Sequence, residues 1–294
     1  MQTYLNRIKT DFLKYRENRW SFSFVEDERE ENGIIYREFN NFPSKEFYSK
    51  IEAISFLVFE DDMENIDKLP DFLNNLPNLE ILEIPIDWLC SLDIPVNIKA
   101  LTLMNSINIR DKYKWCNDLS LLNLKYLSIP EQIKPFEINF ANVPNLEWIN
   151  LDLKAEKKAN KLDELSKLKT LKHLNFSQAK DIDVFTPFSN HNIEAIELFA
   201  CKGKKFPIQN IEVLKKLKCI RINNVSVDFD CTWLLKLSKL IEVEILNVKN
   251  LINVEELLKI DTLKSISILN CNNPIKNKEM FKLKNYELLR IDNA

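Results

Sequence analysis

Glycine and histidine are scarce in this chain. Only Gly33 and Gly203 are glycine among 294 residues, so no phosphate-binding loop of the GxxxxGK or GxGxxG type can be written. The only histidines, His173 and His191, have no Cys or second His nearby at the spacing of metal ligands. The sequence therefore predicts no cofactor, no metal site and no catalytic residue, and its turns must rely on Asn, Asp and Pro.

Cysteine pairs and long apolar runs are lacking as well. The six cysteines form no CxxC pair in a chain too large to need stapling, so we expect reduced thiols. The first eighteen residues carry charges every few positions, unlike a secretory signal peptide, and no stretch approaches the roughly 18 uncharged apolar residues of a membrane span. These features predict a cytoplasmic protein without membrane contact, with leaderless secretion left open.

A short apolar phrase is repeated along the chain. LIEVEI begins at Leu240 and LKSISI begins at Leu263, 23 residues later, and each has apolar residues at its first, fourth and sixth positions. The same phrase recurs from residue 51 onward at intervals of 19 to 28 residues. Its eleven copies open at Ile51, Leu79, Ile98, Leu124, Leu146, Leu171, Ile193, Leu217, Leu240, Leu263 and Tyr286.

The spacing LxxLxL, repeated in units of 20 to 29 residues, resembles the leucine-rich-repeat superfamily over residues 51 to 294. The resemblance implies an α/β solenoid in which a curved parallel sheet of about eleven strands has helical or irregular returns on its convex side. The family's Asn at the ninth position is mostly replaced here, by Cys201, Val225, Val248 and Cys271, while Asn occupies the eighth position of several copies. We therefore expect the turn after each strand to differ from the family's commonest form.

Residues 1 to 50 do not repeat, and we expect them to form an N-terminal cap on a solenoid of residues 51 to 294. Residues 2 to 18 have helical periodicity, and residues 20 to 25 and 34 to 39 are predicted to pair as antiparallel strands across an acidic turn ending at Gly33. The last strand motif, at residues 286 to 291, leaves a sheet edge open, so a homodimer through that edge is one expectation.

Strand alternation selects the candidate binding surface. If the first, fourth and sixth residues of each phrase face the core, the third, fifth and seventh face the concave side of the sheet. The third positions of three successive repeats are Tyr126, Trp148 and His173, an aromatic row of the kind that supplies interface hot spots. The predicted partner-binding residues are Tyr126, Trp148, Asn150, Asp152, His173, Asn175, Glu197, Phe199 and Arg221.

Two interpretations of this row stay open: it binds a partner, or its rings merely pack on one another across the strands. Acids outnumber bases on the concave positions, which argues against nucleic acid as the partner. We therefore predict a non-enzymatic module that binds another protein, as an adaptor, an inhibitor or an effector. The alternative is an enzyme with a cross-repeat site built on His173 with Asp152 or Glu197, and the abundance of Lys, Asn and Ile would suit a bacterial, AT-rich genome.

Overall fold

The computed structural model describes residues 3–13, 19–23, 28–31, 34–38, 41–57, 71–86, 88, 94–104, 120–130, 138–156, 160–272, 275 and 278–292. These residues fall into two compact units. We call residues 1–8 with 147–294 the C-terminal unit, and residues 9–146 the N-terminal unit. The predicted division at residue 50 differs from these bounds and stays a prediction. No helix in the described part of the chain is long and apolar enough to cross a membrane.

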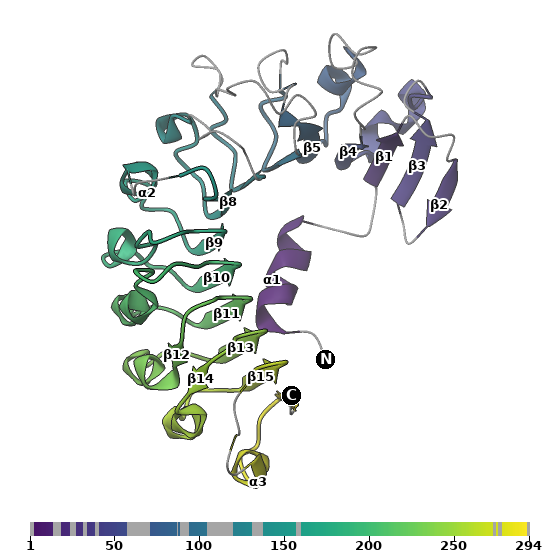
Figure 1. The fold of residues 1–294 in the computed structure, drawn as a ribbon. Coiled ribbons are helices and arrows are strands. Elements are labelled where there is room, and N and C mark those ends of the chain that lie inside the picture. Colours follow the sequence, from purple (N-terminus) through teal and green to yellow (C-terminus); the bar gives the residue numbers. More distant parts are fainter. Residues whose placement is uncertain are drawn as a thin grey trace. The chain divides into compact units, whose positions relative to one another are not determined.

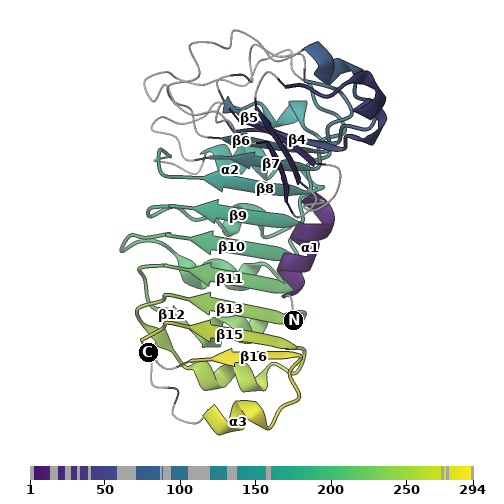
Figure 2. The ribbon, with the colours of Figure 1, turned by 90° about the vertical axis from the view of Figure 1, so that its right-hand side faces the viewer.

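The C-terminal unit is built on a sheet of parallel strands (Figures 1 and 2). Its strands are β8 (Trp148–Asp152), β9 (His173–Ser177), β10 (Ala195–Phe199), β11 (Cys219–Asn223), β13 (Glu242–Leu246), β15 (Ser265–Leu269) and β16 (Leu288–Ile291), in sequence order across the sheet. Neighbouring strands pair in register, so that the third residue of one repeat lies beside the third residue of the next. A second, short parallel pair joins β12 (Phe229–Asp230) to β14 (Leu251–Ile252).

Short helices make the returns of this unit. They are α2 (Asn160–Leu165), η6 (Thr186–Phe188), η7 (Ile208–Val213), η8 (Cys231–Lys236), η9 (Val254–Lys259) and α3 (Lys278–Lys282). Most are 3-10 helices. Leu234 on η8 and Leu257 on η9 are fully buried and complete the core from the side opposite the first turn of α1.

The N-terminal unit continues the repeat in β4 (Ala53–Leu57), β5 (Ile81–Pro85), β6 (Ala100–Met104) and β7 (Tyr126–Ile129), with η1 (Lys45–Lys50), η3 (Asp71–Asn75) and η5 (Phe140–Asn142). Beyond β4 its sheet adds β1 (Arg19–Ser23), β3 (Ile34–Glu38) and β2 (Arg29–Glu31), in the order β4-β1-β3-β2.

The predicted antiparallel hairpin of residues 20–25 and 34–39 is wrong. β1 pairs with β3 and with β4 in the parallel sense, and the antiparallel partner of β3 is β2. The acidic stretch expected to be a turn forms β2 itself. β3 therefore pairs with β2 on one side and with β1 on the other, and β1 extends the parallel sheet from β4. The predicted helix of residues 2–18 is α1 (Tyr4–Leu13), while residues 14–18 and Gly33 lie outside the described residues.

The repeat prediction is confirmed, strand by strand. Each of the eleven predicted phrases forms a strand of the expected parallel sheet, and each strand begins at the third residue of its phrase. The first, fourth and sixth residues are buried in phrase after phrase, as Leu146, Ile149 and Leu151 show. The chain therefore has the predicted α/β fold, a leucine-rich-repeat solenoid.

The turn after the strands explains the displaced asparagines. The eighth residue adopts the left-handed conformation in five successive repeats of the C-terminal unit, at Gln178, Ala200, Asn224, Asn247 and Asn270. Asn tolerates this region better than most residues with a side chain. The Asn270 amide donates to Oδ1 of Asn247, and the Asn247 amide donates to Oδ1 of Asn223, so side chains link consecutive turns on the outside. The ninth residue points into the core, where small apolar side chains fit.

Candidate functional site

We call the face that carries the third, fifth and seventh residues of the phrases the inner face. From β8 to β15 of the C-terminal unit its third positions are buried, which differs from the exposed aromatic row that strand alternation alone predicts. Trp148 is 1% exposed and His173 is also buried. Their rings meet edge to face with centroids 4.6 Å apart, and the Trp148 indole N–H donates to Oδ1 of Asn150 at 3.0 Å. The two rings therefore pack on each other across β8 and β9.

Tyr126, the third member of the predicted row, lies on β7 in the N-terminal unit and is buried there. Its place beside Trp148 would join the two units, so the row of three stays a prediction. The role of all three residues in partner binding stays a prediction as well.

Most fifth and seventh positions of β8 to β10 are more accessible, whereas Glu197 at the fifth position of β10 is buried. Asn150, Asp152 and Asn175 are half-buried, and Phe199 at the end of β10 is 48% exposed. The Asp152 carboxylate accepts hydrogen bonds from Ser177 Oγ at 2.5 Å and from the Gln178 amide at 3.1 Å. This part of the inner face thus presents an exposed aromatic ring beside polar groups that neighbouring repeats hold in place.

Arg221, on β11, binds acids on both sides. Its Nη1 donates to Glu197 on β10 at 2.8 Å, and its Nε donates to Glu244 on β13. Burial acts to lower the pKa of Arg221, but the two carboxylates outweigh burial and raise it. One guanidinium thus pairs with two carboxylates, which leaves this cluster with one net negative charge.

The start of the chain also lies on this face, which sequence reasoning did not predict. Figure 1 shows the first turn of α1 beside the strands of the C-terminal unit. The backbone N–H groups of Tyr4 and Leu5 donate to the Glu242 carboxylate at 2.6 and 3.3 Å. Arg221 Nη2 donates to Oδ1 of Asn6 at 2.9 Å. The sequence held one signal for this contact: the third positions flanking Glu242 are the small residues Ala195, Cys219 and Ser265.

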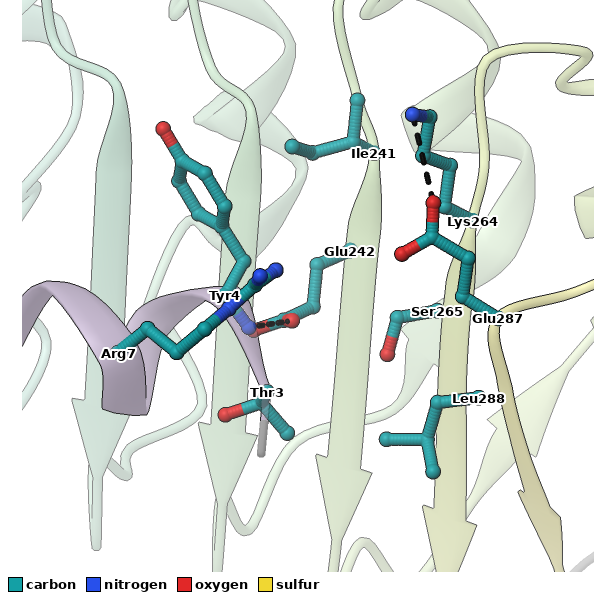
Figure 3. Close-up of a pocket in the computed structure, with 9 residues that line it drawn as sticks. All are labelled: Thr3, Tyr4, Arg7, Ile241, Glu242, Lys264, Ser265, Glu287 and Leu288. Carbon is teal, nitrogen blue, oxygen red and sulfur yellow. Dashed lines mark hydrogen bonds and ion pairs between the residues drawn. The ribbon is translucent and has the colours of Figure 1, made fainter. Parts of the chain in front are cut away.

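A cavity of about 280 Å³ opens beside this contact (Figure 3). Lys264 and Glu287 form an ion pair of 3.4 Å on its wall. The cavity is lined by Thr3, Tyr4, Arg7, Ile241, Glu242, Lys264, Ser265, Glu287 and Leu288.

The alternative of an enzyme built on His173 needs a basic imidazole, and His173 is only weakly basic. Burial lowers the pKa of His173 from 6.5 to about 4, so the imidazole is neutral near pH 7. Its Nδ1 has no hydrogen-bond partner. Within the described ranges, no group of three or more His, Cys, Asp and Glu residues is placed to hold a metal ion.

The buried cysteines are likewise poorly suited to nucleophilic chemistry. Burial raises the pKa of the Cys201 thiol to about 12, which keeps it protonated at neutral pH.

No protein-family model matches the sequence, and no curated protein matches it. Among solved structures, the chain is similar to an internalin of Listeria monocytogenes, with a TM-score of 0.48 and 16% identity over 83% of this chain and 75% of that one. It is also similar to internalin C2 of the same species, with a TM-score of 0.42 and 16% identity over 66% and 81%. A leucine-rich-repeat protein of Leptospira interrogans gives a TM-score of 0.37 and 18% identity over 78% and 76%. The repeated phrase and the parallel strand that each copy forms give this chain the fold of a leucine-rich repeat.

Proposed function

We propose that this chain is a non-enzymatic interaction module that binds another protein on the inner face of its repeats. Stacked repeats expose a long sheet face on which each strand contributes side chains at fixed spacing, and solenoid proteins use such faces for binding. The proposed contact residues are the predicted set, of which Phe199 is exposed, Asn150, Asp152, Asn175 and Arg221 are half-buried, and Glu197 is buried. Trp148 and His173 support that surface from below, and Tyr126 would extend it.

The exposure of Phe199 carries this proposal. Phe199 ends β10 between Ser177 and Asn223 of the neighbouring strands and keeps 48% of its surface accessible. A large aromatic ring among ordered polar groups is the usual composition of an interface hot spot with its polar rim. Binding a protein would remove this ring from water, at a gain of about 1 to 2 kcal/mol for the part now exposed.

The charges around Phe199 favour a protein over a nucleic acid. Asp152 and the Glu197–Arg221–Glu244 cluster place carboxylates on the face, and only one guanidinium accompanies them. A phosphate backbone would meet like charges there. A partner with hydrogen-bond donors or basic side chains fits this surface.

The test is an affinity capture from the organism's own lysate with three forms of the full chain: wild type, Phe199→Ala and Leu235→Ala. Leu235 is the matched control, since it is an apolar residue of similar exposure, 40%, on the return helix η8. We expect a protein that is retained by the wild type and by Leu235→Ala and depleted at least tenfold by Phe199→Ala. Equal retention by all three forms would refute the inner face as the contact surface.

We also propose, separately, that β16 pairs with a second copy of the chain. β16 is bonded to β15 on one side and ends the sheet of the C-terminal unit. An unpaired edge offers a row of N–H and C=O groups to another strand. Light scattering at high protein concentration should give the mass of a dimer, and a strictly monomeric mass would refute this pairing.

A further inference from the structure

The first turn of α1 has its free amides satisfied in two ways. A helix begins with N–H groups that have no partner within the helix. The Thr3 carbonyl accepts the first bond of the helix itself, from the Arg7 N–H at 3.0 Å, and Thr3 Oγ1 accepts from the free Asn6 N–H at 3.2 Å. The remaining two, on Tyr4 and Leu5, donate to Glu242, which lies 238 residues away from Tyr4 in the sequence.

The acceptor of these two bonds is buried. Glu242 is 1% exposed, and burial raises its pKa although the two N–H groups act to lower it. A carboxylate out of water is costly unless hydrogen-bond donors or opposite charges compensate it. The positive end of a helix dipole supplies both donors and favourable charge. The first turn of α1 therefore supplies the donors that compensate this carboxylate where α1 covers it.

Two further contacts define which helix fits. The Leu5 side chain is 1% exposed, so the second residue of the helix is an apolar anchor. The third residue, Asn6, accepts a hydrogen bond from Arg221, which Glu197 and Glu244 hold in position. The small side chains of Ala195, Cys219 and Ser265 at the flanking third positions leave room for a helix to lie close to the strands.

We propose that the inner face of β10, β11, β13 and β15 is a docking site for the first turn of an amphipathic helix of another protein, and that α1 occupies this site in cis until such a helix replaces it. This inference rests on the proposed function and specifies the kind of partner. The partner helix presents free N-terminal amides to Glu242, an apolar residue at its second position and a side-chain acceptor at its third.

Replacement conserves the interactions that make the site stable. One helix start substituted for another leaves Glu242 and Arg221 with the same kinds of hydrogen bonds, so no buried charge is left unpaired in the complex. The cavity beside Thr3 and Tyr4, about 280 Å³ in volume, offers space for the residues that precede the partner's helix. A tethered segment competes at a high effective concentration, on the order of millimolar. A weakly binding helix therefore does not displace α1, and a tightly binding one does.

The test uses a fluorescent peptide of residues 1–13 as the stand-in for the partner helix. The peptide carries Arg7→Lys and is made helical by a lactam between that amine and the Asp11 carboxylate. Its binding to full-length protein is measured by fluorescence anisotropy. In the full chain, Leu5→Asp puts a charge at the buried anchor, and Asn6→Lys places a cation opposite Arg221. Both substitutions release α1 from the face, and the second serves if the first impairs folding, as judged by circular dichroism.

We expect the peptide to bind each released variant at least tenfold more tightly than the wild type, whose own α1 competes. Adding Glu242→Ala to either variant should weaken binding at least tenfold, and a peptide carrying Leu5→Asp should not bind. Equal affinities for the wild type and the folded variants would overturn the proposal. So would a wild-type dimer that dissociates on Leu5→Asp, because the docked helix would then belong to a second copy. Depletion of a partner by Phe199→Ala does not depend on these outcomes, so either proposal can fail alone.

Discussion

Replacing Trp148 with Ala should destabilise the protein strongly, because the structure buries this ring. Burying an aromatic side chain removes roughly 150 to 250 Å² from water, which corresponds to about 4 to 6 kcal/mol at 25 cal/mol per Å². Measured Phe or Trp to Ala changes in cores cost about 3 to 5 kcal/mol, including the cavity left behind. The edge contact of Trp148 with His173 and its N–H bond to Asn150 are lost as well. We expect the free energy of unfolding to fall by about 4 kcal/mol.

The assay is urea denaturation followed by far-UV circular dichroism, which does not depend on the fluorescence of the deleted indole. Trp148→Phe is the control, because it keeps an aromatic ring against His173 and loses only the larger indole; we expect a loss of about 1 to 2 kcal/mol. A loss below about 1 kcal/mol for Trp148→Ala would refute the argument from burial. It would mean that Trp148 lies open on the inner face, as strand alternation by itself indicates.

Three further predictions concern the same unit. Since the pKa of His173 is lowered from 6.5 to about 4, the unfolded chain binds a proton in this range that the folded chain does not bind. The free energy of unfolding should therefore fall by about 3 kcal/mol between pH 6.5 and pH 4. His173→Phe should remove this pH dependence from the free energies measured by urea denaturation. Ala200 has the left-handed φ of 53°, so Ala200→Asn should raise the free energy of unfolding by up to about 1 kcal/mol, whereas a loss would contradict the assigned turn. In a Cys90→Ser, Cys116→Ser background, the buried thiols should resist a disulfide reagent at pH 8 until urea is added, and rapid native labelling would contradict their burial; they are Cys201, Cys219, Cys231 and Cys271.

The strands were predictable because their signal is local and repeated. Residues two places apart lie on the same face of a strand, so the phrase LxxLxL marks the core positions without knowledge of the fold. Each of its copies, from Ile51 to Tyr286, opens a strand of the parallel sheet. The left-handed turn could be anticipated in part, since Asn recurs at the eighth position where the backbone adopts a positive φ.

The pairing of the N-terminal strands was not predictable in the same way. Residues 20–25 and 34–39 alternate like strands, and two such strands separated by a short polar segment are normally antiparallel. That local rule failed because β1 found a partner in β4, which is more than twenty residues away, and β2 formed within the segment taken as a turn. Long-range pairing decided the sense of the strands.

The sequence by itself determined which residues face the core and which face the inner side, because that choice depends only on the two-residue period of a strand. Only the tertiary structure decided what covers the inner side. Trp148 and Glu242 both occupy the third position of a phrase, and alternation assigns both to the surface. The structure buries Trp148 against His173 and buries Glu242 under the amides of Tyr4 and Leu5, since contacts between residues 25 and 238 positions apart have no local pattern to reveal them.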